Sequence, residues 1–174
     1  MVWTNLLRGT FEYDYAVAEK LLDMFKDSEL NWKPATGSNW MTVGQLLHHI
    51  TNACGSGVKG FATGDWGFPP DMDPSQMPAD MMLPPAEKLP SVTSVAEAKK
   101  LLAEDKKLAF EILAKCNEER LANEIAKAPW DNMEMILGQR LLQMAQHLNA
   151  HKGQLFYYLK LQGKPVNTMH LWGV

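Results

Sequence analysis

The chain has 174 residues, of which 46% are hydrophobic and 21% charged, which is the composition of a globular protein with one core. Its 17 Lys and Arg side chains are outnumbered by 20 Asp and Glu, giving a formal net charge of -3, which argues against binding to nucleic acid. No apolar run approaches the roughly 18 residues that a membrane span requires, and residues 1–5 lack the basic and apolar stretches of a secretion signal. We therefore expect a single domain over residues 1–174, cytoplasmic, with neither a membrane nor a nucleic-acid partner.

Four segments carry apolar residues at intervals of three and four, the spacing of a helix with one buried face. They cover residues 4–29, 42–63, 94–117 and 137–161. Thr42 with Gln45, and Ser94 with Glu97, have the spacing of a capping box, which marks the start of a helix. No segment shows the sustained alternation of a strand. The sequence therefore predicts an all-α fold, a four-helix bundle.

A proline-rich connection separates the second predicted helix from the third. Residues 64–90 contain seven of the ten prolines, so a helix cannot continue through them. A connection this long exceeds what an antiparallel hairpin requires, and we interpret it as a crossover at one end of the bundle. It is either a solvated link with its methionines packed down, namely Met72, Met77, Met81 and Met82, or a lid over a site.

Two of the five histidines lie one turn apart on the fourth predicted helix. His147 and His151 are four residues apart, so both imidazoles can reach one ion. At 100° per residue they fall roughly 105° and 65° from the centre of the apolar stripe, on the shoulder of the core. Arg140, Gln154 and Tyr158 share this column, so polar side chains continue above and below the pair.

The second predicted helix offers a third histidine. His49 lies roughly 100° from the centre of its apolar stripe, whereas His48 lies roughly 160° away and is expected on the surface. Three neutral imidazoles, from His49, His147 and His151, would bind a divalent metal and leave a fourth position open, as catalytic sites do. Imidazole suits zinc and nickel, and also iron, manganese and cobalt. The alternative is that these histidines are hydrogen-bonded residues at the edge of the core.

Two polar side chains and two cysteines are further candidates for a functional site. Gln154, three residues after His151, is a candidate for orienting a ligand histidine, and Tyr158 for donating to a substrate; helix packing would explain either one. Cys54 and Cys116 are too few for a disulfide framework and form no CxxC pair, so we interpret them as buried core residues.

Two separated motifs resemble the DinB/YfiT-like family of metal-dependent enzymes. Residues 38–50 (SNWMTVGQLLHHI) are similar to a family segment whose histidine precedes an aliphatic residue, which selects His49. Residues 147–155 (HLNAHKGQL) are similar to the family pattern HxxxHxGQ, and a tail over residues 164–173 follows. The resemblance implies a four-helix bundle with a crossed connection, commonly a homodimer, that binds a divalent metal through His49, His147 and His151.

The chemistry that this resemblance implies is of two kinds. Some members are thiol-dependent S-transferases or isomerases that use a low-molecular-weight thiol, and others are metal-dependent hydrolases. We therefore expect a metal, zinc or nickel before iron, manganese or cobalt, that activates water or a low-molecular-weight thiol toward a small-molecule substrate. The alternative is a non-catalytic, metal-stabilised helical dimer that acts as a stress-related interaction protein.

Overall fold

The computed structural model describes residues 2–69, 72 and 84–174. Its longer helices are α1 (Trp3–Leu22), α2 (Val43–Ile50), α3 (Gly55–Thr63), α5 (Val95–Leu113) and α7 (Leu137–Leu161). The shorter elements are the 3-10 turns η1 (Asp27–Glu29) and η3 (Ala86–Lys88), the helices α6 (Glu118–Asn123) and α8 (Thr168–Trp172), and the strands β1 (Ile125–Ala126) and β2 (Met135–Ile136). The predicted all-α fold is confirmed, since the two strands are two residues each and form a single antiparallel pair.

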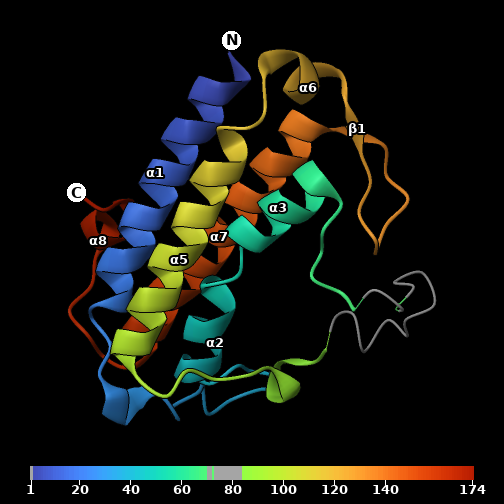
Figure 1. The fold of residues 1–174 in the computed structure, drawn as a ribbon. Coiled ribbons are helices and arrows are strands. Elements are labelled where there is room, and N and C mark those ends of the chain that lie inside the picture. The colour runs from blue at the N-terminus through green and yellow to red at the C-terminus, as the bar shows by residue number, and fades with distance from the viewer. Residues whose placement is uncertain (1, 70–71, 73–83) are drawn as a thin grey trace.

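The helices close a ring around one hydrophobic core (Figure 1). Helix α1 packs against α5 and α7, and α3 packs against the same two helices from the other side. Helix α2 continues the side formed by α3 and also contacts α5 and α7. The predicted stripes supply the core, with Leu7, Phe11, Leu46, Leu47, Leu148 and Leu155 fully buried. Among the helices of the described ranges, none combines the length and apolar character that crossing a bilayer requires.

The predicted helix over 42–63 is in fact two helices, α2 and α3, separated by a turn at residues 51–54. Asp105, a buried residue of α5, accepts hydrogen bonds from the backbone N–H of Gly55 (2.9 Å) and of Ser56 (3.1 Å). This carboxylate caps a new helix start. A Cβ on Gly55 would lie 2.2 Å from the Asp105 carbonyl oxygen, so only glycine permits this approach. The break therefore arises from a contact between residues 50 positions apart, which helical periodicity does not reveal.

Other helix ends also differ from the prediction. The first helix ends at Leu22 rather than at residue 29, and the third ends at Leu113 rather than at residue 117. The capping box of Thr42 and Gln45 forms, with bonds of 2.8 and 3.2 Å. At α5 only half of the expected box forms, because Glu97 accepts from the backbone N–H of Thr93 instead of from that of Ser94.

The segment between α5 and α7 contains structure that the sequence analysis did not predict. Helix α6 is capped by Asn117, and β1 pairs with β2. The fully buried Arg140 holds this hairpin, because its guanidinium donates to the carbonyls of Ala126 and Met133 and pairs with Asp131 at 2.7 Å. The sequence analysis placed Arg140 in the same helical column as the histidines. In the structure its side chain instead forms this ion pair with Asp131.

The proline-rich connection is described only at its two ends, residues 64–69 and 84–90, and at Met72, which is exposed. Met77, Met81 and Met82 lie outside the described residues. The choice between a solvated link and a lid depends mainly on residues 70–71 and 73–83. That choice therefore also lies outside the described residues.

Candidate metal centre

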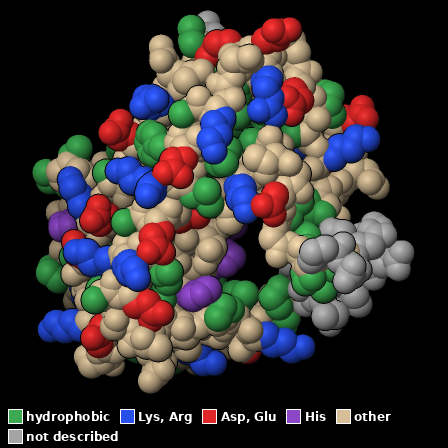
Figure 2. Space-filling model, in the orientation of Figure 1, with side chains coloured by type: hydrophobic (Ala, Val, Ile, Leu, Met, Phe, Trp, Pro, Cys, Tyr) green, Lys and Arg blue, Asp and Glu red, His purple; other side chains and the backbone are tan. Residues whose placement is uncertain are grey.

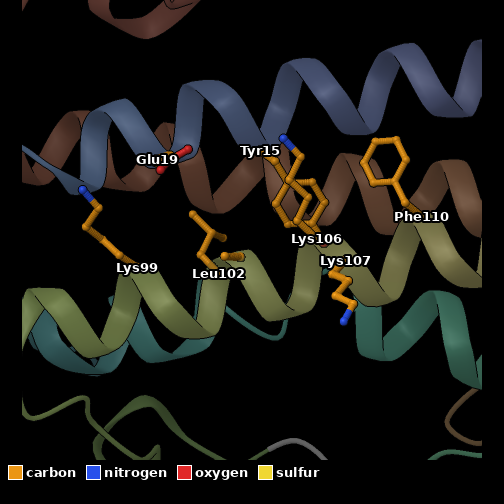
Figure 3. Close-up of a pocket in the computed structure, with 8 residues that line it drawn as sticks. Tyr15, Glu19, Lys99, Leu102, Lys106, Lys107 and Phe110 are labelled. Carbon is orange, nitrogen blue, oxygen red and sulfur yellow. The ribbon is translucent and has the colours of Figure 1, made fainter.

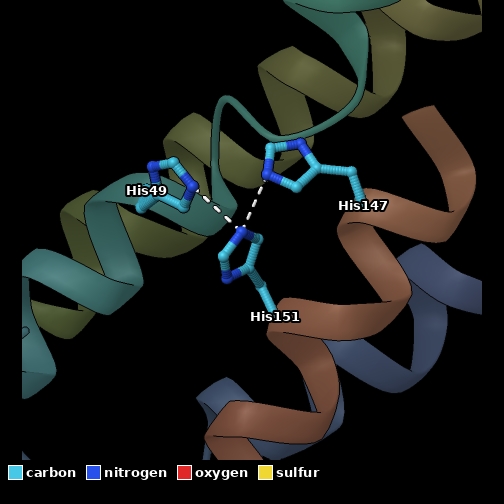
Figure 4. A group of neighbouring side chains, drawn as sticks. All are labelled: His49, His147 and His151. Carbon is cyan, nitrogen blue, oxygen red and sulfur yellow. Dashed lines mark hydrogen bonds between the residues drawn. The ribbon is translucent and has the colours of Figure 1, made fainter. Parts of the chain in front are cut away.

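Three histidines from two helices converge on one point (Figure 4). His49 reaches it from α2, and His147 and His151 reach it from successive turns of α7. Nε2 of His151 lies 2.8 Å from Nε2 of His147 and 3.0 Å from Nε2 of His49. The candidate ligand atoms of all three lie within 4.8 Å of one another, and all three side chains are half-buried.

The outer nitrogens of the two α7 histidines face oxygen acceptors. Nδ1 of His147 lies 2.9 Å from the carbonyl oxygen of Ala53, and Nδ1 of His151 lies 2.7 Å from Oε1 of Gln154. Because a carbonyl oxygen only accepts, the neutral imidazole carries its proton on Nδ1 in both cases. This tautomer leaves a free lone pair on each Nε2, and the two lone pairs point into the cluster.

This donor set fits a divalent metal ion. Two imidazole lone pairs 2.8 Å apart repel each other unless a proton or a cation lies between them. Three nitrogens bound tetrahedrally to one ion at about 2.1 Å lie about 3.4 Å apart, so small side-chain movements would bring the cluster to that geometry. The Nδ1–H contacts to Ala53 and Gln154 are the kind of outer hydrogen bond that metal-binding histidines make.

The surroundings favour the neutral form of His49 and of His151. Burial, together with the positive charge that His151 and His147 would carry, lowers the pKa of His49 to about 4. Burial also lowers the pKa of His151, against the hydrogen bond that its Nδ1–H donates to Gln154, which raises it. Neutral imidazole is the form that binds a metal, so the lowered pKa values favour the ligating form of His49 and His151.

The other predicted site residues have different surroundings. Gln154 contacts His151 directly, as the orienting interpretation requires. The Tyr158 hydroxyl donates to the Met41 carbonyl at 2.9 Å and its ring packs against Trp32 and Trp40, so the structure uses it in packing and does not bring it into the histidine cluster. His48 lies outside the cluster and is half-buried, whereas the sequence analysis expected it on the surface.

Both cysteines are buried in the core, as predicted. Burial raises the pKa of the Cys54 thiol, as it does that of Cys116. Each thiol is therefore kept protonated, and neither belongs to the group of side chains that could hold a metal ion.

A cavity beside the centre was missed by the sequence analysis. It has a volume of about 280 Å³ and lies between α3, the residues after it, the β1–β2 connection and α7, with His147 in its wall. Figure 2 shows histidine side chains at the rim of a hollow on this face. The half-exposed tryptophans Trp66 and Trp130 line the cavity, and their separation by 64 residues explains why no local motif revealed it.

Comparison with known proteins agrees with this geometry. A family model described as the DinB superfamily matches residues 10–155, a range that includes all three histidines. No curated protein and no solved structure gave a significant match. The matched range covers most of the chain, and the protein therefore belongs to the DinB superfamily.

Proposed function

We propose that this protein is a metal-dependent enzyme in which His49, His147 and His151 hold one divalent ion. The observation that carries the proposal is the convergence of three imidazole Nε2 atoms, two of them with the proton fixed on the far nitrogen. A purely structural role would not require two hydrogen-bond acceptors to face each other at 2.8 Å. Imidazole ligation favours zinc or nickel, with iron, manganese or cobalt as further candidates.

The side chains of the centre have separable roles in this proposal. His49, His147 and His151 bind the ion, while the Ala53 carbonyl and Gln154 hold the rings in the ligating tautomer. The bound ion would supply Lewis-acid chemistry, lowering the pKa of a water or thiol in its open position. The cavity beside His147 then holds the substrate against the centre. The reaction class that follows is hydrolysis, or transfer of a low-molecular-weight thiol to an electrophile.

A second candidate function has its own support. Tyr157 and Leu161 are four residues apart on α7, with 63% and 61% of their surfaces exposed. Such a pair on the outer face of a helix suits packing against a second copy of the chain. In this candidate the protein is a homodimer whose metal only stabilises the bundle.

The metal content of untagged protein tests the site first. We would measure metal per chain, after reconstitution with zinc or nickel and dialysis, in wild type, His49→Ala, His151→Ala and His48→Ala. We expect about one equivalent in wild type and His48→Ala, and a loss in the other two. His48 is the matched control because it adjoins His49 and lies outside the cluster. Equal metal content in all four proteins, or none in wild type, would overturn the site.

Activity of the loaded protein separates the two candidate functions. We would test ester hydrolysis, and addition of a low-molecular-weight thiol to an aryl electrophile, with the metal-free protein as control. Turnover that requires both the metal and His151 supports the enzyme. Metal-dependent thermal stability and self-association without any turnover would instead support the structural dimer, and Tyr157→Lys would then give a monomer.

A further inference from the structure

The cavity beside the metal centre has a chemical character of its own. Its larger walls are aromatic or apolar, from Trp66, Phe68, Trp130 and Met144. The rings of Trp66 and Trp130 meet edge to face, with centroids 5.0 Å apart, and Phe61 supports Trp66 from behind at 4.8 Å. Edge-to-face stacking fixes both indoles in place, so the wall is preformed.

Polar groups are few and uncharged in this cavity. Asn52 and Ser56 form its polar side, and among the described residues that line it none carries a full charge. The Ser56 hydroxyl already donates to the Asn52 carbonyl at 2.7 Å. A charged substrate group would therefore lose its hydration here without gaining a partner, whereas an apolar ring would gain contacts.

Two glycines of α3 make room for these walls. A Cβ on Gly57 would lie 2.3 Å from the sulfur of Met144, and a Cβ on Gly60 would lie 2.2 Å from the ring of Trp66. Glycine inside a helix is unfavourable by about 1 kcal/mol relative to alanine. The close approach of the cavity walls gives both glycines a structural purpose.

The cavity also touches the metal centre directly. The His147 ring lines the cavity while its Nε2 faces His151, and Ala53 lines it while its carbonyl oxygen faces Nδ1 of His147. A ring bound in the cavity therefore lies against one of the three candidate ligands.

We propose that this cavity binds an uncharged aromatic group of the substrate and presents the substrate's reacting atom to the metal centre. The proposal rests on the proposed function, since it assigns a substrate class to the same site. The volume of about 280 Å³ lies just below the range of ligand pockets, about 300 to 1,000 Å³, and suits a small group of one or two fused rings. Aromatic walls supply the contacts, and uncharged Asn52 and Ser56 leave room for one neutral polar substituent.

Binding of 2-naphthol to the metal-free protein tests the proposal without needing turnover. We expect saturable binding by isothermal titration calorimetry in wild type and at least tenfold weaker binding in Trp130→Ala. Gly57→Ala is expected to weaken binding as well, because the added methyl group pushes Met144 into the cavity. Trp172→Ala is the matched control: Trp172 is also a half-exposed tryptophan, and it packs over Lys152, outside the lining residues.

Three further measurements test the position and the charge class of the bound group. Contacts between naphthol protons and the His147 ring in NMR spectra would support the assigned position. Binding of naphthalene-2-sulfonate as tight as that of 2-naphthol would overturn the uncharged class. A second cavity, between α1 and α5, is lined by Phe110. Unchanged binding in Trp130→Ala with loss in Phe110→Ala would place the ligand there and overturn the proposal. The naphthol experiment uses metal-free protein, so a failure of binding would overturn the aromatic substrate class alone. The metal titration tests the proposed function separately.

Discussion

Two of the cavities among the described residues differ in size and in chemistry. The larger, of about 420 Å³, lies between α1 and α5 and is lined by Tyr15, Glu19, Leu102, Phe110 and a group of lysines that includes Lys99 and Lys106 (Figure 3). The smaller, of about 280 Å³, lies between α3 and α7 and includes His147. In the larger cavity the Tyr15 hydroxyl already donates to Asp105, and Lys99 already pairs with Asp23. The convergent imidazoles lie beside the smaller cavity, so the greater volume does not coincide with the candidate metal centre.

The largest expected effect is a loss of bound metal on mutation at the smaller cavity but not at the larger one. His147→Ala removes a ligand from the smaller cavity, and we expect metal to fall from about one equivalent to background. Lys106→Ala removes a cation from the larger cavity and is expected to leave the metal content unchanged. Elemental analysis of the two untagged variants makes the measurement, and a loss of metal in Lys106→Ala would erase the distinction.

Asp105 connects the two cavities, and its removal should affect both. It accepts from the Tyr15 hydroxyl at 2.6 Å and from the backbone of Gly55 and Ser56. Asp105→Ala leaves three buried or partly buried donors unpaired, so we expect the free energy of unfolding to fall by about 3 kcal/mol. Urea denaturation measures this loss.

The neighbouring Glu104→Ala provides the control for that measurement. The Glu104 side chain is exposed, and its ion pair with Lys100 is long, at 3.9 Å, so a change of less than about 0.5 kcal/mol is expected. Equal losses in the two variants would show that Asp105 does not hold the cavities together.

The ion pairs beside the two cavities should differ in strength. Asp131 follows Trp130 at the smaller cavity and pairs with fully buried Arg140, whereas Asp23 pairs with Lys99 in the open, where both side chains are nearly half exposed. We expect Asp131→Asn to lower the free energy of unfolding by about 2 kcal/mol, since Arg140 keeps its carbonyl partners. Asp23→Asn is expected to change it by less than about 0.5 kcal/mol.

The same pair gives a pH dependence with a definite sign. The hydrogen bond from Arg140 lowers the pKa of Asp131 below the ordinary value of 3.8 in the folded protein. The pair therefore stabilises the fold above that value, and its contribution disappears as the pH falls through the lowered pKa. The difference in urea stability between wild type and Asp131→Asn should be constant from pH 7 to 5 and shrink below 3.8. A difference that grows on acidification would contradict the assignment.

The smallest effect is expected at Gln154, which orients a ligand without binding the metal. Gln154→Ala should retain one equivalent of metal and weaken its affinity by about tenfold. Gln146→Ala, an exposed glutamine on the same helix, should leave the affinity unchanged. Competition with a chromogenic chelator measures both constants.

Local patterns predicted the parts of the fold that local physics determines. The apolar stripes gave the helix faces and the buried leucines, and the i,i+4 spacing of His147 and His151 gave their shared direction. His49 was found because it lies before the break in the second predicted helix, where the periodicity still applies. The break itself comes from Asp105 and was not predicted, because the capping residue belongs to another helix.

The surroundings of the centre needed the tertiary structure. The Ala53 carbonyl meets His147 across 94 residues of sequence, and Trp130 reaches the cavity from the connection between the two-residue strands β1 and β2. Arg140 shares a helical column with the histidines, yet it turns to Asp131 and the hairpin. Spacing on one helix gives the direction in which a side chain leaves the axis, and only packing determines the partner that it meets.

The turn at residues 51–54 has a consequence for how the centre tolerates mutation. In an unbroken helix the Ala53 carbonyl would accept from the N–H of Gly57, and the break leaves it to His147. The acceptor that orients His147 is thus a main-chain atom, which no substitution at position 53 can delete. The acceptor that orients His151 is the side chain of Gln154, which one substitution removes. Two candidate ligands one turn apart on α7 therefore differ in their tolerance of mutation. The backbone fixes the tautomer of His147, and a single replaceable side-chain amide fixes that of His151.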